Sequence, residues 1–244
     1  MSELLRGRGR RIAGAARVAF ASCFVFASLA DGWARAEEVE RTPPKTYHAT
    51  AVVRGDLGLR IIDYWSRGSD MLARTLVGGH EIVTIVFGGR YVVYDALTGK
   101  GLDIERAPRA LAADAGRARP FAFELAELKA EGGERVEETN FGSRKGEVWQ
   151  VTDGRGRRKV WVTVGVPTVP LRVETFDRAT SATVDLDYQN WTFDLELSDA
   201  FFAPPARIEL QNFEFDAFLE ATTRGRVGAV PILYPDLLFG APPG

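Results

Sequence analysis

The chain has 244 residues, one cysteine, two histidines and a formal net charge of −2. This length fits one β-rich domain with a leader, or at most two small domains. Hydrophobic residues make up 45% and charged residues 26%, a balance that supports a folded core and excludes wholesale disorder. No basic excess recommends nucleic acid as a partner. Because the only cysteine is Cys23, no disulfide can form within the chain, and a cysteine-ligated metal site is not expected.

Residues 1–36 have the pattern of a secretory signal peptide. Arginines at positions 6 to 11 precede an apolar run over 18–30, and Ala34-Arg35-Ala36 forms a small-x-small cleavage pattern. The apolar run is shorter than the roughly 20 residues that a membrane-spanning helix needs. We therefore expect cleavage after Ala36 and export to the periplasm. The alternatives are a retained anchor, a lipoprotein acylated at Cys23 and a twin-arginine signal at Arg10-Arg11.

The first part of the mature chain is typical of an antiparallel meander. Residues 37–46 are charged and rich in proline near their end, which predicts an extended arm. Short β-rich segments then alternate with turn residues such as Gly78-Gly79 and Gly88-Gly89. The strands expected here are 47–53, 59–65, 71–77, 81–87 and 90–95.

The middle of the chain has a different pattern. Over 108–130, Phe121, Leu125 and Leu128 recur at helical spacing, and Gly132-Gly133 ends the pattern. This spacing predicts one helical interlude, or two short helices broken near Pro120.

Strands resume after the interlude and are followed by an apolar extension. The expected strands are 134–141, 147–152, 159–164, 171–176, 183–188 and 191–197. The last of these alternates apolar and acidic residues, so it has one apolar face. Residues 207–244 are apolar and interrupted by prolines. This extension covers a cleft, adds a strand or docks a partner, and the sequence leaves the three roles open.

The sequence contains no motif of a known catalytic or phosphate-binding site. His80-Glu81 matches the start of a zinc-binding helix motif, but no second histidine follows at the required spacing. Asp185, Asp187 and Asp194 allow a glycosidase-like pair, although alternation along a strand places such carboxylates on a solvated face. We expect no enzymatic activity, no metal and no cofactor, with a carboxylate-dependent hydrolase as the alternative.

Large aromatic side chains concentrate on the expected strands. They either pack in a core or line an apolar cavity. A single sheet with few helices has too little cover for both faces, so it closes on itself or leaves a cleft. An error of one residue in register would reverse the face of every side chain on a strand. The candidate lipid-binding residues are Trp65, Val83, Ile85, Phe87, Trp149, Trp161, Phe176, Trp191 and Phe193.

Four segments, taken in order, resemble one protein family. They are the run over 59–95 that ends in Gly88-Gly89-Arg90-Tyr91-Val92-Val93-Tyr94-Asp95, the helical interlude 108–130, the hairpin 159–177, and the closing segment 187–205. Over about residues 45–206, this order resembles the LolA/LolB-type periplasmic lipoprotein carriers and their wider superfamily of lipid-binding envelope proteins.

The resemblance implies a mainly β, α+β domain over 47–206. This would be an incomplete antiparallel β-barrel of about ten to eleven strands, whose helical lid encloses an apolar cleft. It also implies a monomeric periplasmic carrier that shields acyl chains of a lipid or an acylated lipoprotein during transfer towards the outer membrane. Its further partners would be an inner-membrane transporter or an outer-membrane acceptor. The alternative is an envelope regulatory or scaffold protein that senses lipid or binds a protein partner, since one fold serves several functions.

Overall fold

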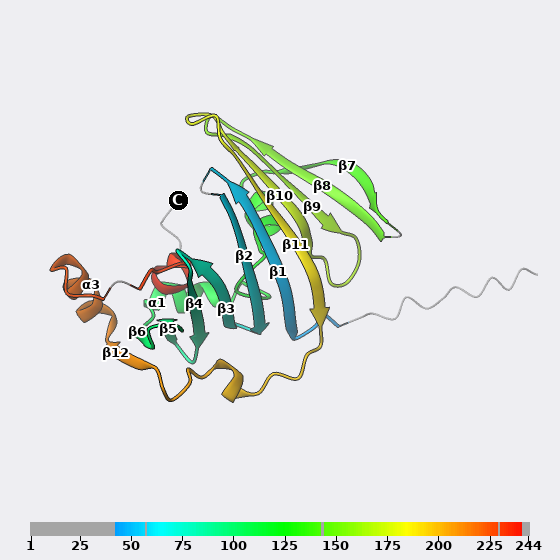
Figure 1. Cartoon of the computed structure of the whole chain (residues 1–244). Coiled ribbons are helices and arrows are strands. Elements are labelled where there is room, and N and C mark those ends of the chain that lie inside the picture. Colours follow the sequence, from blue (N-terminus) through cyan, green and yellow to red (C-terminus); the bar gives the residue numbers. More distant parts are fainter. Residues whose placement is uncertain (1–41, 57, 143, 229, 241–244) are drawn as a thin grey trace, which may run out of the picture. The chain divides into compact units, whose positions relative to one another are not determined.

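A computed structural model describes residues 42–56, 58–142, 144–228 and 230–240. Within these ranges the chain forms one twelve-stranded sheet with a few short helices (Figure 1). The expected signal peptide, residues 1–36, lies outside the described residues, as do positions 37–41 of the expected arm. Residues 42–45 contain no regular element, and the first strand begins at Thr46.

The strands follow one another as two antiparallel meanders. The first comprises β1 (Thr46–Gly55), β2 (Gly58–Arg67), β3 (Asp70–Val77), β4 (His80–Phe87), β5 (Arg90–Asp95) and β6 (Lys100–Glu105). The second comprises β7 (Glu134–Phe141), β8 (Arg144–Thr152), β9 (Gly156–Thr163), β10 (Pro170–Asp177) and β11 (Thr183–Phe193). Antiparallel pairing of β1 with β11 joins the two meanders into one sheet.

The sheet is open, with β7 at one edge and β12 (Glu209–Phe213) at the other. This confirms the expected incomplete barrel, with twelve strands in place of ten to eleven. The sequence pattern does not predict the strands at 100–105 and 209–213. Both are short, and β12 is held by parallel pairing with β6, a long-range contact that no local pattern records. The segment expected over 183–188 and the first residues of the one expected over 191–197 form a single strand, which ends at Phe193, so the prediction of a strand over 194–197 is wrong.

Paired glycines set the tight turns of the first meander. Between β3 and β4, Gly78 and Gly79 have φ values of 60° and 86°. Two successive positive φ values produce the type of turn whose twist matches the two strands of a two-residue hairpin. Residues that carry a Cβ rarely adopt positive φ values, so glycine is favoured at both positions. This turn fixes the register in which Val77 lies opposite His80.

The helical interlude expected over 108–130 is present as two short helices, α1 (Pro108–Asp114) and α2 (Glu124–Ala130). Pro108 suits the first turn of α1, where a backbone N–H would have no partner within the helix. Between the helices the chain carries Phe121 and Ala122, which are buried against the sheet. The face of the sheet that they cover is called the inner face below.

The inner face carries the larger of two core clusters. Alternate residues of β1 to β6 point into it, as the period of two along a strand requires. Buried strand residues of this cluster include Tyr47, Ala49, Met71, Ala73, Val86, Tyr91, Val93 and Ile104. The cluster extends to β9, β10 and β11 through Val160, Val173 and Tyr188, so it connects the two meanders.

The outer face of β2 to β5 is covered by residues 194–208, here called the outer cover (Figure 1). This segment contains a short 3-10 helix, η1 (Asp199–Phe202). The ring of Phe202 stacks on Phe87 with centroids 6.1 Å apart, and Phe201 meets Trp65 edge-on at 5.9 Å. The outer cover therefore completes a second core cluster on the opposite side of the same strands.

The C-terminal extension is integrated into the fold. β12 pairs with β6 and is followed by α3 (Phe215–Thr223). Residues 230–240, here called the inner cover, include α4 (Pro235–Phe239) and pack on the inner face. The backbone N–H of Ala107 donates to the carbonyl of Leu238 at 2.9 Å, and Leu238 is 0% exposed. The extension thus adds a strand and covers the sheet, two of the roles that the sequence leaves open.

Candidate binding site

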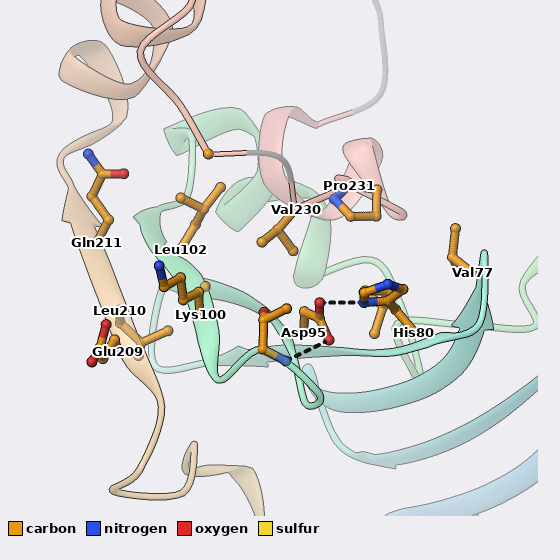
Figure 2. A pocket seen from close by; sticks show the side chains of 14 residues that line it. Val77, His80, Asp95, Lys100, Leu102, Glu209, Leu210, Gln211, Val230 and Pro231 are labelled. Carbon is orange, nitrogen blue, oxygen red and sulfur yellow. Dashed lines mark hydrogen bonds and ion pairs between the residues drawn. The ribbon is translucent and has the colours of Figure 1, made fainter.

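A cavity of about 1040 Å³ lies between the inner face and the start of the inner cover (Figure 2). Strands β4, β5, β6 and β12 form its floor, and the end of β3 closes one side. Its volume is at the upper end of the roughly 300–1,000 Å³ typical of ligand pockets. Its larger apolar lining residues are Val77, Ile82, Leu102, Leu210, Val230 and Pro231.

The strand register divides this floor into polar and apolar rows. At the strand ends, Asp95 lies opposite Lys100, and Lys100 lies opposite Glu209. Two positions further along, Val93 lies opposite Leu102 on the same face of the sheet. Lys100 and Glu209 are exposed, whereas Val93 and Leu102 are buried. Gln211, which also lines the cavity, lies opposite Leu102. The lining therefore mixes polar and apolar side chains, and Asp95, Lys100 and Glu209 gather at one end, here called the mouth.

Three donors hold Asp95 at the mouth. The Nδ1 of His80 donates to one carboxylate oxygen at 2.7 Å, and the backbone N–H groups of Leu97 and Thr98 donate to the other at 2.8 and 3.3 Å. Burial acts to raise the pKa of Asp95, but these hydrogen bonds together lower it below its ordinary value. The mouth thus presents an ionised carboxylate beside the ammonium of Lys100, a mixture that suits a polar head group.

A second cavity, of about 200 Å³, lies further along the inner face between residues 120–124 and 233–237. Its walls are largely aromatic. Tyr64 stacks on Phe121 with centroids 4.7 Å apart and meets Tyr234 edge-on at 5.9 Å. Burial raises the pKa of Tyr64 to about 12, so its hydroxyl stays protonated at physiological pH.

The smaller cavity also contains two carboxyl groups, Glu124 and Asp236. Oε1 of Glu124 accepts a hydrogen bond from the hydroxyl of Tyr188 at 2.7 Å. Its other oxygen, Oε2, is buried and has no hydrogen-bond partner among the described residues. Burial raises the pKa of Glu124. A buried carboxyl with an unused acceptor in an aromatic pocket is a feature of ligand sites.

Three of the residues predicted to bind lipid pack on the inner face: Trp149, Trp191 and Phe193. Trp191 stacks on Phe121 with centroids 5.8 Å apart, so it supports one wall of the smaller cavity from behind. The Nε1 of Trp149 donates to Glu147 at 3.0 Å. None of the three lines either of the two cavities described above.

Trp65, Val83, Ile85 and Phe87 instead belong to the outer-face cluster beneath the outer cover. In β4 the neighbouring residues Ile82 and Val86 point to the inner face. The strand is buried on both sides, so alternation does not show which of its faces borders a cavity.

Trp161 and Phe176 also lie on the outer face, on the second meander. Register places Trp161 opposite Arg172 and Phe176 opposite Arg157. Val173, which follows Arg172 on β10, points inward, so Arg172 and its partner Trp161 point outward. The guanidinium of Arg172 lies over the ring of Trp161 at 5.4 Å. The nine candidate residues are therefore divided between two faces and do not form one site.

Several cavity-lining residues are absent from the candidate residues predicted from the sequence. Leu102 lies on β6, Leu210 on β12 and Val230 in the inner cover. The apolar character of 207–244 was the available signal, but pairing of β12 with β6 is what brings these segments together.

Among the described helices, none has the length and apolar composition needed to cross a membrane. In the described ranges, no group of three or more His, Cys, Asp or Glu side chains is arranged to hold a metal ion.

No family profile and no curated protein matches the chain. Structures with a similar fold include an uncharacterized conserved protein from Thermus thermophilus, with 11% identity, a TM-score of 0.49, and coverage of 69% of this chain and 91% of that one. The MucA/MucB complex of Pseudomonas aeruginosa matches with 15% identity and a TM-score of 0.42, over 67% of this chain and 57% of that one.

A LolA superfamily protein from Nitrosomonas europaea matches with 11% identity and a TM-score of 0.30, over 67% of this chain and 92% of that one. Likenesses at this identity concern the fold alone.

Proposed function

We propose that this protein binds the acyl chains of a lipid or an acylated lipoprotein in the larger cavity and carries them through the periplasm towards the outer membrane. The observation that supports this function is the cavity of about 1040 Å³, which is lined by apolar side chains such as Ile82, Leu102 and Val230 and has a polar mouth. Each methylene that leaves water for such an interior contributes about 0.8 kcal/mol. Asp95, Lys100 and Glu209 would remain in contact with the head group.

The polar groups at the mouth favour binding over catalysis. His80 and Asp95 form a hydrogen-bonded pair, as in a nucleophile–base–acid triad. However, among the described residues no hydroxyl or thiol hydrogen-bonds to His80, so the nucleophile of such a triad is missing. We therefore propose a carrier without enzymatic activity.

The test compares Val230→Asp with Val136→Asp. Val230 lines the cavity, whereas Val136 is exposed on the edge strand β7, away from it. Uptake of a fluorescent fatty-acyl probe should fall at least about tenfold in Val230→Asp, because a buried charge opposes an acyl chain. The control should match the wild type.

Native mass spectrometry of the protein from its own envelope fraction should show an acylated ligand. An empty protein that also takes up no probe would exclude the carrier function.

A second candidate is an envelope regulator or scaffold that binds a protein partner. An exposed apolar patch on the outer face favours it: Leu59 and Ile61 on β2 and Leu76 on β3 are 64%, 52% and 66% exposed. Patches of this kind are common at protein interfaces. If the protein is such a regulator or scaffold, a double variant with Ile61→Lys and Leu76→Lys should lose capture of the protein partner. It should still take up the fluorescent fatty-acyl probe. Deleting the C-terminal extension would be a poor test, since it would remove the core residue Leu238.

A further inference from the structure

The smaller cavity has a chemistry that acyl-chain transport does not use. Five aromatic residues line it, and Glu124 and Asp236 contribute carboxyl groups. The aromatic residues are Tyr64, Phe121, Phe123, Tyr188 and Tyr234. Its volume of about 200 Å³ is below that of pockets for drug-sized ligands, so an occupant must be small or a single head group.

One buried polar atom of the cavity-lining residues, Oε2 of Glu124, has no hydrogen-bond partner within the described residues. The hydroxyl of Tyr234 lies beside that of Tyr64. Leaving such groups unpaired costs free energy, and native proteins satisfy nearly all of them with protein, water or a ligand. Tyr188 already donates to the first oxygen of Glu124, so Oε2 is the oxygen of this carboxyl group that lacks a partner.

Among the described lining residues there are two carboxyl groups and neither lysine nor arginine. Beyond the lining, the charges of Arg119 and Arg158 act on Glu124 and lower its pKa, against the effect of burial. The guanidinium of Arg119 also has other partners. It lies over the rings of Tyr47 and Trp191 at 5.1 and 5.4 Å, and its Nη2 donates to the carbonyl of Ala122 at 2.7 Å.

From this arrangement we infer that the smaller cavity binds a small organic ammonium ion. The electron-rich faces of aromatic rings attract such cations, and quaternary ammonium groups are recognised in this way. The carboxylate of Glu124 supplies the opposite charge within a desolvated pocket. This site is separate from the larger cavity and does not depend on the proposed acyl carriage.

An ammonium group can come from a free organic cation or from a lipid head group. Calorimetric titration of the purified protein with choline chloride and with glycerophosphocholine separates these sources. Binding of both assigns the site to a head group, and binding of choline alone assigns it to a free cation. The uncharged isostere 3,3-dimethylbutan-1-ol has the shape of choline without its charge. Equal affinity for choline and this alcohol, or no heat with any of the three, would overturn the inference.

Glu124→Gln keeps the size of the side chain and removes its charge. Choline affinity should fall about tenfold, which corresponds to about 1.4 kcal/mol, while affinity for the alcohol should not change. The matched control is Glu127→Gln, because Glu127 lies on the same helix but does not line the cavity. An unchanged choline affinity in folded Glu124→Gln would contradict the role of the carboxylate.

A second pair of variants tests the rings without altering charge. Tyr234→Phe keeps the ring and should retain most of the choline affinity, whereas Tyr234→Leu removes it and should lower the affinity about tenfold. Circular dichroism establishes that each variant is folded. Equal affinities in the two variants would show that no ring–cation contact forms.

Discussion

The outer and inner covers lie on opposite faces of the same strands, and they differ in what they leave between themselves and the sheet. The outer cover fills its face with aromatic rings, such as Phe202 against Phe87. The inner cover borders two cavities, each containing an ionisable side chain, Asp95 in one and Glu124 in the other. Two proline-containing segments therefore pack on opposite faces of one sheet with different results. One cover packs closely against its face, and the other leaves two cavities.

The largest effect should come from the outer cover. Phe202→Ala should lower the free energy of unfolding by about 3–5 kcal/mol, since the ring is 1% exposed and its loss leaves a cavity. Urea denaturation measures this change. Leu219→Ala, at a side chain that is 41% exposed, should change the stability by about 0.5 kcal/mol or less. Acyl-probe affinity of folded Phe202→Ala should equal that of the wild type, and a parallel loss of affinity would contradict the division between the covers.

A smaller effect is expected where the inner cover is anchored. The buried guanidinium of Arg106 makes two hydrogen bonds to Asp114, at 2.7 and 2.9 Å, and one to the carbonyl of Leu237 at 2.6 Å. Arg106→Gln leaves Asp114 without its partner and should cost about 3 kcal/mol. Hydrogen exchange at the Ala107 amide should accelerate, because that amide donates to the inner cover.

The matched control for this anchor is an exposed ion pair. Arg155 is paired with Asp153, and its side chain is 85% exposed. Arg155→Gln should therefore change the stability by less than about 1 kcal/mol. Similar losses in the two variants would mean that Arg106 acts only as a surface charge.

The smallest effect concerns alkaline pH and again distinguishes the faces. Burial raises the pKa of Tyr91, on the inner face, to about 12, against about 10 in an unfolded chain. The raised value means that this stabilisation is complete below pH 10 and is lost as the pH rises towards 12. The free energy of unfolding is measured at pH 9 and at pH 11. Its change between these two values should be about 1 kcal/mol smaller in Tyr91→Phe than in the wild type.

Tyr94, on the outer face of the same strand, is the comparison for this experiment. Its pKa is also raised by burial, but the hydroxyl is less enclosed. Tyr94→Phe should reduce the alkaline loss by a smaller amount. The alkaline loss of stability would have to be reduced more in Tyr94→Phe than in Tyr91→Phe to refute this comparison. That result would mean that the hydroxyl on the inner face is not the more deeply buried one.

The sequence by itself determined the local elements of this protein. Alternation and glycine turns such as Gly78-Gly79 predict the first meander, and the spacing of Phe121, Leu125 and Leu128 predicts the helical interlude. These features depend on interactions between residues close in the chain. The family resemblance adds the open, barrel-like sheet, whereas the pairing of β1 with β11 is visible only in the structure.

Only the tertiary structure decided which residues border a cavity. In β4, Ile82 points inward and Val83 outward, yet both are buried, so hydrophobicity does not distinguish their faces. The larger cavity exists because β12 joins β6 and the inner cover follows it back over the sheet. Such contacts link residues more than a hundred positions apart. Their stability comes from the shape of the assembled surfaces, which a local pattern of residues does not record.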